Sequence, residues 1–174
     1  MRLFIAAELP EELLEALSET SAALRDAVPG RYVAPSNFHV TLAFLGETDG
    51  ARVPALCGAL DEACAGFSPM AARLGALGNF GRRSRATRWQ AVETDGELEA
   101  LAKAVRSQLR SGGFSFDDKG FLAHMTLMRY ADLSRGELPM PSIANGEIDT
   151  VTLFKSDLSG KHPVYTPLHT VLLA

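Results

Sequence analysis

Residues 38–46 read FHVTLAFLG, and residues 121–129 read FLAHMTLMR. Both segments are apolar enough to form strands, yet each carries a histidine that is followed two positions later by a threonine and then by a leucine. Successive side chains of a strand point to opposite faces, so each His-x-Thr unit places an imidazole and a hydroxyl side by side on one face. The sequence therefore predicts two strands that present the same pair of polar groups.

Strict alternation also predicts which neighbours share that face. In the first segment Ala43 falls on the face of His39, and Phe44 falls on the opposite face. In the second segment Arg129 falls opposite His124, so its long side chain would have to reach around the end of the strand to meet the imidazole.

The hydrophobic pattern of the whole chain predicts an α+β fold. Amphipathic helices are expected at about residues 10–28, 49–66 and 97–110. Strands are expected at residues 2–9, 38–46, 69–80, 85–93 and 121–129, and in EIDTVTLFKSDL and HPVYTPLHTVLL. A capping box, Thr94-x-x-Glu97, marks the start of the third helix. Because the helices come singly between pairs of strands, we expect largely antiparallel sheets rather than a doubly wound parallel sheet.

Length and composition are those of an ordinary globular domain. The chain has 174 residues, of which 47% are hydrophobic and 22% charged, and its net charge of −4 argues against a bulk polyanion binder. No apolar run approaches the roughly 20 residues that cross a bilayer, and the start MRLFIAAELPEELL reads as a strand entering a helix, not a signal peptide. Cys57 and Cys64 are too far apart along a helix for a disulfide, which fits a reducing compartment. We expect a cytoplasmic monomer that binds no membrane.

One basic stretch stands out against the negative net charge. GRRSRATR, which is expected to join two strands, contains Arg82, Arg83, Arg85 and Arg88. Either a solvated loop or a contact to nucleic acid explains this stretch.

Three interpretations of the repeated His-x-Thr-Leu unit fit poorly. A purely structural role does not require the unit to occur twice. A metal site needs three or four ligands, and the other histidines, His162 and His169, sit in no His/Cys/carboxylate cluster of the sequence. A nucleophilic hydrolase would need a G-x-S-x-G elbow or a cysteine in a reactive context, and the sequence has neither.

Paired acid–base chemistry on a phosphate fits best. One histidine can accept a proton while the other donates one, and each role contributes on the order of 10² to 10⁴ in rate. Threonine hydroxyls can donate hydrogen bonds to the phosphate oxygens, and no metal or other cofactor is then expected. Because the two units match, we expect similar surroundings for both histidines and pKa values not far from the usual value of about 6.5.

The segments around these units resemble a known family. RLFIAAELP, RYVAPSNFHVTLAFLGE, FLAHMTLMRY and VTLFKSDLSGKHPVYTPL resemble the two-histidine phosphoesterases, specifically the RNA 2′,3′-cyclic phosphodiesterases, also called 2′-5′ RNA ligases. The resemblance implies one domain over residues 1–174, with two pseudo-symmetric lobes of mostly antiparallel sheet and outer helices around a central cleft. The chain departs from the family at Ala123, where proline is common, and at Tyr32, where tryptophan is favoured.

The resemblance also implies roles for individual residues. His39 would donate a proton to the leaving 3′ oxygen, and His124 would accept one from the attacking water. Thr41 and Thr126 would hold the phosphate, and Arg129 would lie near it.

The implied activity is metal-independent hydrolysis of RNA 2′,3′-cyclic phosphate ends to 2′-phosphates. RNA ends or small cyclic nucleotides would be the substrates. Ordinary packing is the favoured interpretation of Phe121 and Tyr32, and stacking on the base is the alternative. The alternatives are 2′-5′ RNA ligation, hydrolysis of another small cyclic phosphate, and a non-catalytic RNA-end binding module. The intact histidines and threonines argue against the binding module.

Overall fold

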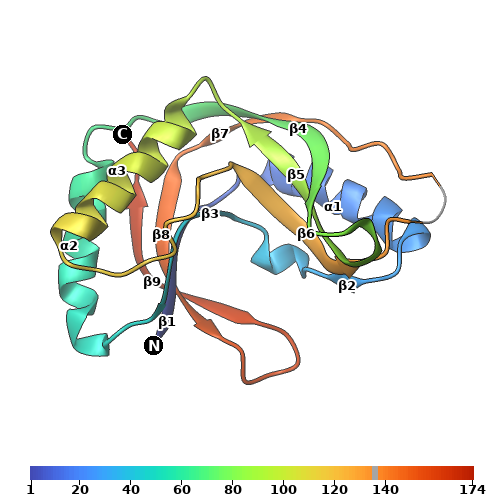
Figure 1. Ribbon diagram of the computed structural model, residues 1–174. Coiled ribbons are helices and arrows are strands. Elements are labelled where there is room, and N and C mark those ends of the chain that lie inside the picture. The colour runs from blue at the N-terminus through green and yellow to red at the C-terminus, as the bar shows by residue number, and fades with distance from the viewer. Residues whose placement is uncertain (135–136) are drawn as a thin grey trace.

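The computed structural model describes residues 1–134 and 137–174, and it confirms the α+β class (Figure 1). The strands form two sheets in which the paired strands run antiparallel, as predicted. The four-stranded sheet has the order β3 (Val40–Glu47), β1 (Arg2–Ala7), β8 (Thr150–Asp157) and β9 (Val164–Leu172). The five-stranded sheet has the order β2 (Arg31–Tyr32), β6 (His124–Ala131), β5 (Ala86–Glu93), β4 (Met70–Phe80) and β7 (Asn145–Ile148).

The two His-x-Thr strands belong to different sheets. The first unit lies at the start of β3, at one edge of the four-stranded sheet, and the second lies in β6 of the five-stranded sheet. The backbone N–H of His39 donates to the sulfur of Met125 at 3.1 Å, so the two strands meet where their histidines stand.

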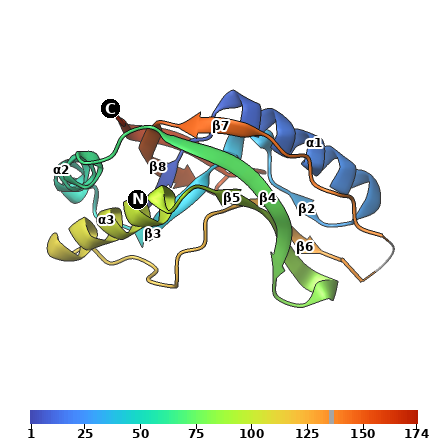
Figure 2. The ribbon, with the colours of Figure 1, turned by 90° about the horizontal axis from the view of Figure 1, so that it is seen from above.

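The three α-helices of the described residues lie outside this meeting point: α1 (Glu11–Ala27), α2 (Val53–Cys64) and α3 (Glu97–Ser111). Helices α2 and α3 pack on each other and against the four-stranded sheet, whereas α1 lies beside β7 of the five-stranded sheet (Figures 1 and 2). The helices therefore bury the outer faces of the sheets and leave the region between the two His-x-Thr strands uncovered.

Local sequence explains where the helices begin. Pro10 precedes α1, the acidic first turn suits the positive end of the helix dipole, and the predicted stripe of Leu13, Leu17 and Leu24 is fully buried. Helix α3 begins at Glu97, after Gly96 in a left-handed conformation with φ of 99°.

The capping box predicted for α3 is only half present. The hydroxyl of Thr94 accepts from the backbone N–H of Leu98 at 3.1 Å, but Thr94 lies outside the helix, whose N-cap position is occupied by Gly96. The left-handed glycine delays the first helical residue to Glu97.

Each His-x-Thr strand contains a β-bulge just after its threonine. In β3, Thr41 pairs with Ala6 while Ala43 pairs with Ile5, so Leu42 is an extra residue. As a result Leu42 and Ala43 are both buried, and the alternation resumes with its phase reversed. The same happens in β6, where Thr126 pairs with Trp89 and Met128 pairs with Arg88, which leaves Leu127 as the extra residue.

The bulges overturn the strict alternation that the sequence suggested. Phe44 and Arg129, which were expected to face away from the histidines, both line the cavity that contains them. Arg129 therefore reaches the site directly, because the bulge turns its side chain to the face of His124 and Thr126.

Candidate active site

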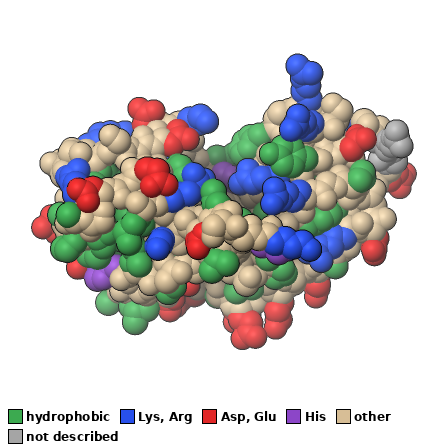
Figure 3. All heavy atoms as spheres, turned by 90° about the horizontal axis from the view of Figure 1, so that it is seen from below, with side chains coloured by type: hydrophobic (Ala, Val, Ile, Leu, Met, Phe, Trp, Pro, Cys, Tyr) green, Lys and Arg blue, Asp and Glu red, His purple; other side chains and the backbone are tan. Residues whose placement is uncertain are grey.

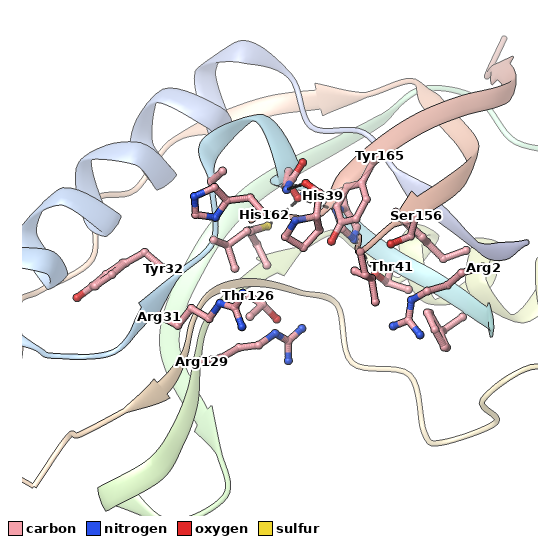
Figure 4. A pocket seen from close by; sticks show the side chains of 18 of the residues that line it. Arg2, Arg31, Tyr32, His39, Thr41, Thr126, Arg129, Ser156, His162 and Tyr165 are labelled. Carbon is pink, nitrogen blue, oxygen red and sulfur yellow. Dashed lines mark hydrogen bonds between the residues drawn. The ribbon is translucent and has the colours of Figure 1, made fainter. Parts of the chain in front are cut away.

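The two sheets enclose one cavity of about 610 Å³ where β3 and β6 meet. All five residues to which the resemblance gave roles line it, namely His39, Thr41, His124, Thr126 and Arg129. Figure 4 shows Thr41 and Thr126 on opposite sides of this space, with the Arg129 side chain extending between them. The fold thus brings together residues that lie far apart in the sequence.

A matching backbone hydrogen bond orients each imidazole. The Nδ1 of His39 lies 2.7 Å from the carbonyl oxygen of Asn37, and the Nδ1 of His124 lies 2.5 Å from that of Leu122. A carbonyl can only accept, so Nδ1 carries the hydrogen in both rings and Nε2 is the atom that can exchange a proton. The repeated sequence unit therefore produces a repeated tautomer.

The surroundings of His39 are aromatic. Its ring centroid lies 4.9 Å from that of Phe4 and 5.4 Å from that of Tyr165, and its Nε2 lies 2.8 Å from the Thr41 hydroxyl. Burial lowers the pKa of His39 to about 4; the hydrogen bond to Asn37 opposes this shift, and the charges of His124 and Arg129 add to it. In neutral His39 the Thr41 hydroxyl donates to Nε2.

His124 occupies a different environment. Its ring makes edge contacts with Phe80 and Trp89, at centroid distances of 5.3 and 5.7 Å. Trp89 in turn lies flat against Gly78, where a Cβ would collide with the indole ring. The expectation of similar surroundings for both histidines is therefore wrong, because a strand repeat does not repeat the side chains that other strands pack on it.

The cavity carries positive charge although the chain as a whole is acidic. Arg2, Arg31, Arg129 and Lys161 line it, and none of the described lining residues is an Asp or a Glu. Lys and Arg side chains gather along the middle of the face seen in Figure 3. The guanidinium of Arg2 lies over the ring of Phe44 at 4.5 Å, so this arginine is held at the cavity wall by a cation–π contact. Such a site suits an anion.

Sequence reasoning missed several lining residues. Arg2, Arg31, Lys161, His162 and Tyr165 were not singled out, although all five lie in the segments that carry the family resemblance. Burial raises the pKa of Tyr165, which therefore stays a neutral hydroxyl.

The positions of Phe121 and Tyr32 show which of these two rings could contact a ligand in the cavity. Phe121 does not line the cavity and lies beside Arg106, whose guanidinium is 5.8 Å from its ring centroid, so Phe121 has the packing role that was favoured for it. Tyr32 does line the cavity, and its hydroxyl donates to the Val28 carbonyl at 2.6 Å.

The remaining histidine and the cysteines lie elsewhere. His169 lies outside the cavity, 2.7 Å from the carboxylate of Asp61, and Cys57 and Cys64 are free thiols, as expected. Among the residues that the structure describes, no group of three or more His, Cys, Asp or Glu side chains is placed to hold a metal ion. In the same part of the chain, none of the helices has the length and apolar character to span a membrane.

Two antiparallel sheets that each bring a His-x-Thr unit to one basic cavity define a phosphoesterase of the two-histidine class. The family model described as LigT like Phosphoesterase matches residues 7–89. An RNA 2′,3′-cyclic phosphodiesterase of Thermotoga maritima is 30% identical, over 97% of this chain and 94% of the relative. The chain belongs to this family of LigT-like RNA 2′,3′-cyclic phosphodiesterases.

Other relatives agree. A Geobacillus stearothermophilus RNA 2′,3′-cyclic phosphodiesterase is 36% identical over 72% of this chain, but the match spans only 41% of that relative. The crystal structure of TT0787 of Thermus thermophilus superposes with a TM-score of 0.86 at 28% identity, covering 99% of this chain and 98% of that one. Escherichia coli LigT in complex with 3′-AMP superposes with a TM-score of 0.81 at 30% identity, covering 99% and 97%.

Proposed function

We propose that this protein hydrolyses 2′,3′-cyclic phosphates at RNA ends to 2′-phosphates. The observation that carries the proposal is the pair of histidines whose Nδ1–H groups are held by carbonyls, which leaves Nε2 as the proton-exchanging atom of each ring in one basic cavity. The relatives are RNA 2′,3′-cyclic phosphodiesterases, and E. coli LigT has been crystallised with 3′-AMP. A cavity of about 610 Å³ is within the usual range for a nucleotide-sized ligand.

In this mechanism the two imidazoles act on opposite sides of the phosphorus. His124 takes a proton from water as the water oxygen bonds to phosphorus, and His39 gives its Nε2 proton to the 3′ oxygen as the P–O3′ bond breaks. The product is a 2′-phosphate with a free 3′-hydroxyl. A proton then passes from His124 to solvent, and another returns to His39.

Substrate binding prepares His39 for its role as donor. The pKa of about 4 makes this imidazole neutral in the free protein at pH 7. A bound phosphodiester brings a negative charge close to the ring and counters Arg129, so the pKa of His39 rises when substrate is present. The Thr41 hydroxyl, no longer needed by a protonated Nε2, can then turn its hydrogen to a phosphate oxygen.

Thr126 and Arg129 supply donors on the other side of the phosphate. Arg129 offers a planar fork of N–H groups, a geometry that matches two oxygens of one phosphate. Together with the threonines these donors stabilise the charge that develops on the non-bridging oxygens, and we propose that no metal ion is needed.

The test is hydrolysis of a 2′,3′-cyclic mononucleotide in the presence of EDTA, with the product identified as the 2′-phosphate. His39→Ala and His124→Ala should each lower turnover by at least about 100-fold, because each removes an acid or a base. His169→Ala is the matched control, since this histidine lies outside the cavity, and it should retain wild-type turnover.

Other outcomes would point elsewhere. Binding of RNA ends without turnover would indicate a binding module, and an accumulation of 2′-5′ linkages would indicate ligation. Activity that is lost in EDTA and restored by one divalent ion would replace the paired-histidine mechanism with metal-assisted hydrolysis. Wild-type turnover in either cavity variant would refute the assigned roles.

A further inference from the structure

One rim of the cavity continues onto the surface as a basic and aromatic strip. Arg31 of β2 pairs in register with Arg129 of β6, and both line the cavity. Tyr130 follows Arg129, also lines the cavity, and is 54% exposed. Its φ of 54° lies in the left-handed region, which an aromatic residue rarely adopts, so the chain holds this ring outward against its own backbone preference.

The arginine-rich stretch of the sequence meets the cavity at Tyr130. The guanidinium of Arg85 lies over the Tyr130 ring, 4.8 Å from its centroid. Arg83 and Arg88 have structural partners instead, because they donate to the Leu133 carbonyl at 2.8 Å and to the Asn79 side-chain oxygen at 3.2 Å. Of these three arginines, the one stacked on the cavity rim is therefore Arg85.

We propose that Arg31, Tyr130 and Arg85 form a binding track for single-stranded RNA, occupied by the nucleotides just 5′ of the cyclic phosphate. The proposal rests on the proposed function and extends it from the reacting end to the RNA chain. A 2′,3′-cyclic phosphate is by chemistry a 3′ end, so the rest of the RNA must leave the cavity across its rim. The track offers guanidinium groups for backbone phosphates and an exposed aromatic face for a base.

A single-stranded ligand suits this surface better than a duplex. Stacking on a tyrosine needs an unpaired base, and an arginine already stacked on the ring adds a positive charge beside it. Such recognition tolerates any sequence, because every base has a stacking face. The track therefore predicts a preference for chain length rather than for sequence.

The experiment compares a 2′,3′-cyclic mononucleotide with a short single-stranded RNA that ends in a 2′,3′-cyclic phosphate. Wild-type protein should show the higher kcat/KM for the oligonucleotide. Arg85→Ala should lower this value about fivefold or more while leaving the mononucleotide unchanged, since Arg85 does not line the cavity. The slope of log kcat/KM against log salt for the oligonucleotide should become shallower by about 0.7, the value for one lost phosphate contact on a single strand.

Arg110→Ala is the matched control. Arg110, in the last turn of α3, also stacks on an aromatic ring, with its guanidinium 5.1 Å from the centroid of Phe116, and it does not line the cavity. Arg110→Ala removes one positive charge and one cation–π contact, as Arg85→Ala does, but away from the cavity. The kcat/KM for both substrates should therefore equal that of the wild type.

A binding assay keeps this inference separate from the activity. Fluorescence anisotropy of a labelled single-stranded RNA that ends in a 2′-phosphate should show weaker binding by Arg85→Ala, whether or not the wild type turns over cyclic phosphates. If the wild type does not turn over cyclic phosphates but still binds RNA more tightly than Arg85→Ala does, the proposed function is refuted and the binding track is supported. Equal RNA binding by wild type and Arg85→Ala, or an equal loss on both substrates, would overturn the track.

Discussion

The burial of His39 should make the stability of the protein depend on pH in a defined way. The imidazole has a pKa of about 4 in the folded protein and about 6.5 in an unfolded chain. Between these values the unfolded state binds more protons than the folded state, so the free energy of unfolding increases with pH. The stabilisation is complete above about pH 6.5 and is lost as the pH falls toward 4.

The magnitude follows from the two pKa values. At pH 5 the residue is almost fully protonated in the unfolded chain and about one-tenth protonated in the folded protein. Linkage then gives a loss of about 2 kcal/mol between pH 7 and pH 5, an order-of-magnitude figure for this one group. This is a large share of the 5–15 kcal/mol that is typical of a folded domain.

Urea unfolding at pH 7 and at pH 5 measures the effect. His39→Gln removes the titration and keeps a polar side chain of similar reach, so its free energy of unfolding should decline between these pH values by about 2 kcal/mol less than that of the wild type. The comparison cancels the other titrating groups. An identical decline in both proteins, or an NMR titration of His39 near 6.5, would refute the argument from burial.

Two further predictions address activity. The acid limb of kcat/KM should lie near pH 4, because burial gives His39 a pKa of about 4 in the free protein. Tyr165→Ala should move this limb upward by admitting water to the ring, and a wild-type limb near 6.5 would contradict the assignment. Gly78→Ala should lower kcat by about 10- to 100-fold with little change in KM, because the new Cβ displaces Trp89 and with it His124. The control is Gly58→Ala, because a Cβ at Gly58 would meet nothing within 4 Å.

The sequence predicted the fold class and the two His-x-Thr units because these depend on local pattern, whereas Arg129 was expected only from the family resemblance. Alternation in residues 38–46 and 121–129 is a property of the strands themselves. The bulges at Leu42 and Leu127 are different, because each arises from pairing with a partner strand that the local sequence does not specify. Neither bulge is marked by a glycine, so the turn of Phe44 and Arg129 toward the cavity could not be predicted.

The electrostatics of the site depend even more on long-range packing. Phe4 and Tyr165 come from opposite ends of the chain and close around His39 only when β1, β8 and β9 lie side by side. The matched His-x-Thr units hold both rings in the same tautomer, but the pKa expected from them was wrong for the buried ring. Hydrogen bonds to a residue two positions away are encoded locally, whereas desolvation is a property of the assembled fold.

The different surroundings of His39 and His124 matter in a cavity rich in arginine. Burial, and after it the positive charges of His124 and Arg129, lower the pKa of His39 and keep its imidazole neutral in the empty site. A phosphodiester that binds beside His39 offsets these positive charges and supplies the negative charge that a protonated His39 requires. In the proposed mechanism the proton that the leaving oxygen needs is thus favoured when substrate is bound, and Arg129 contributes to this control together with burial and His124.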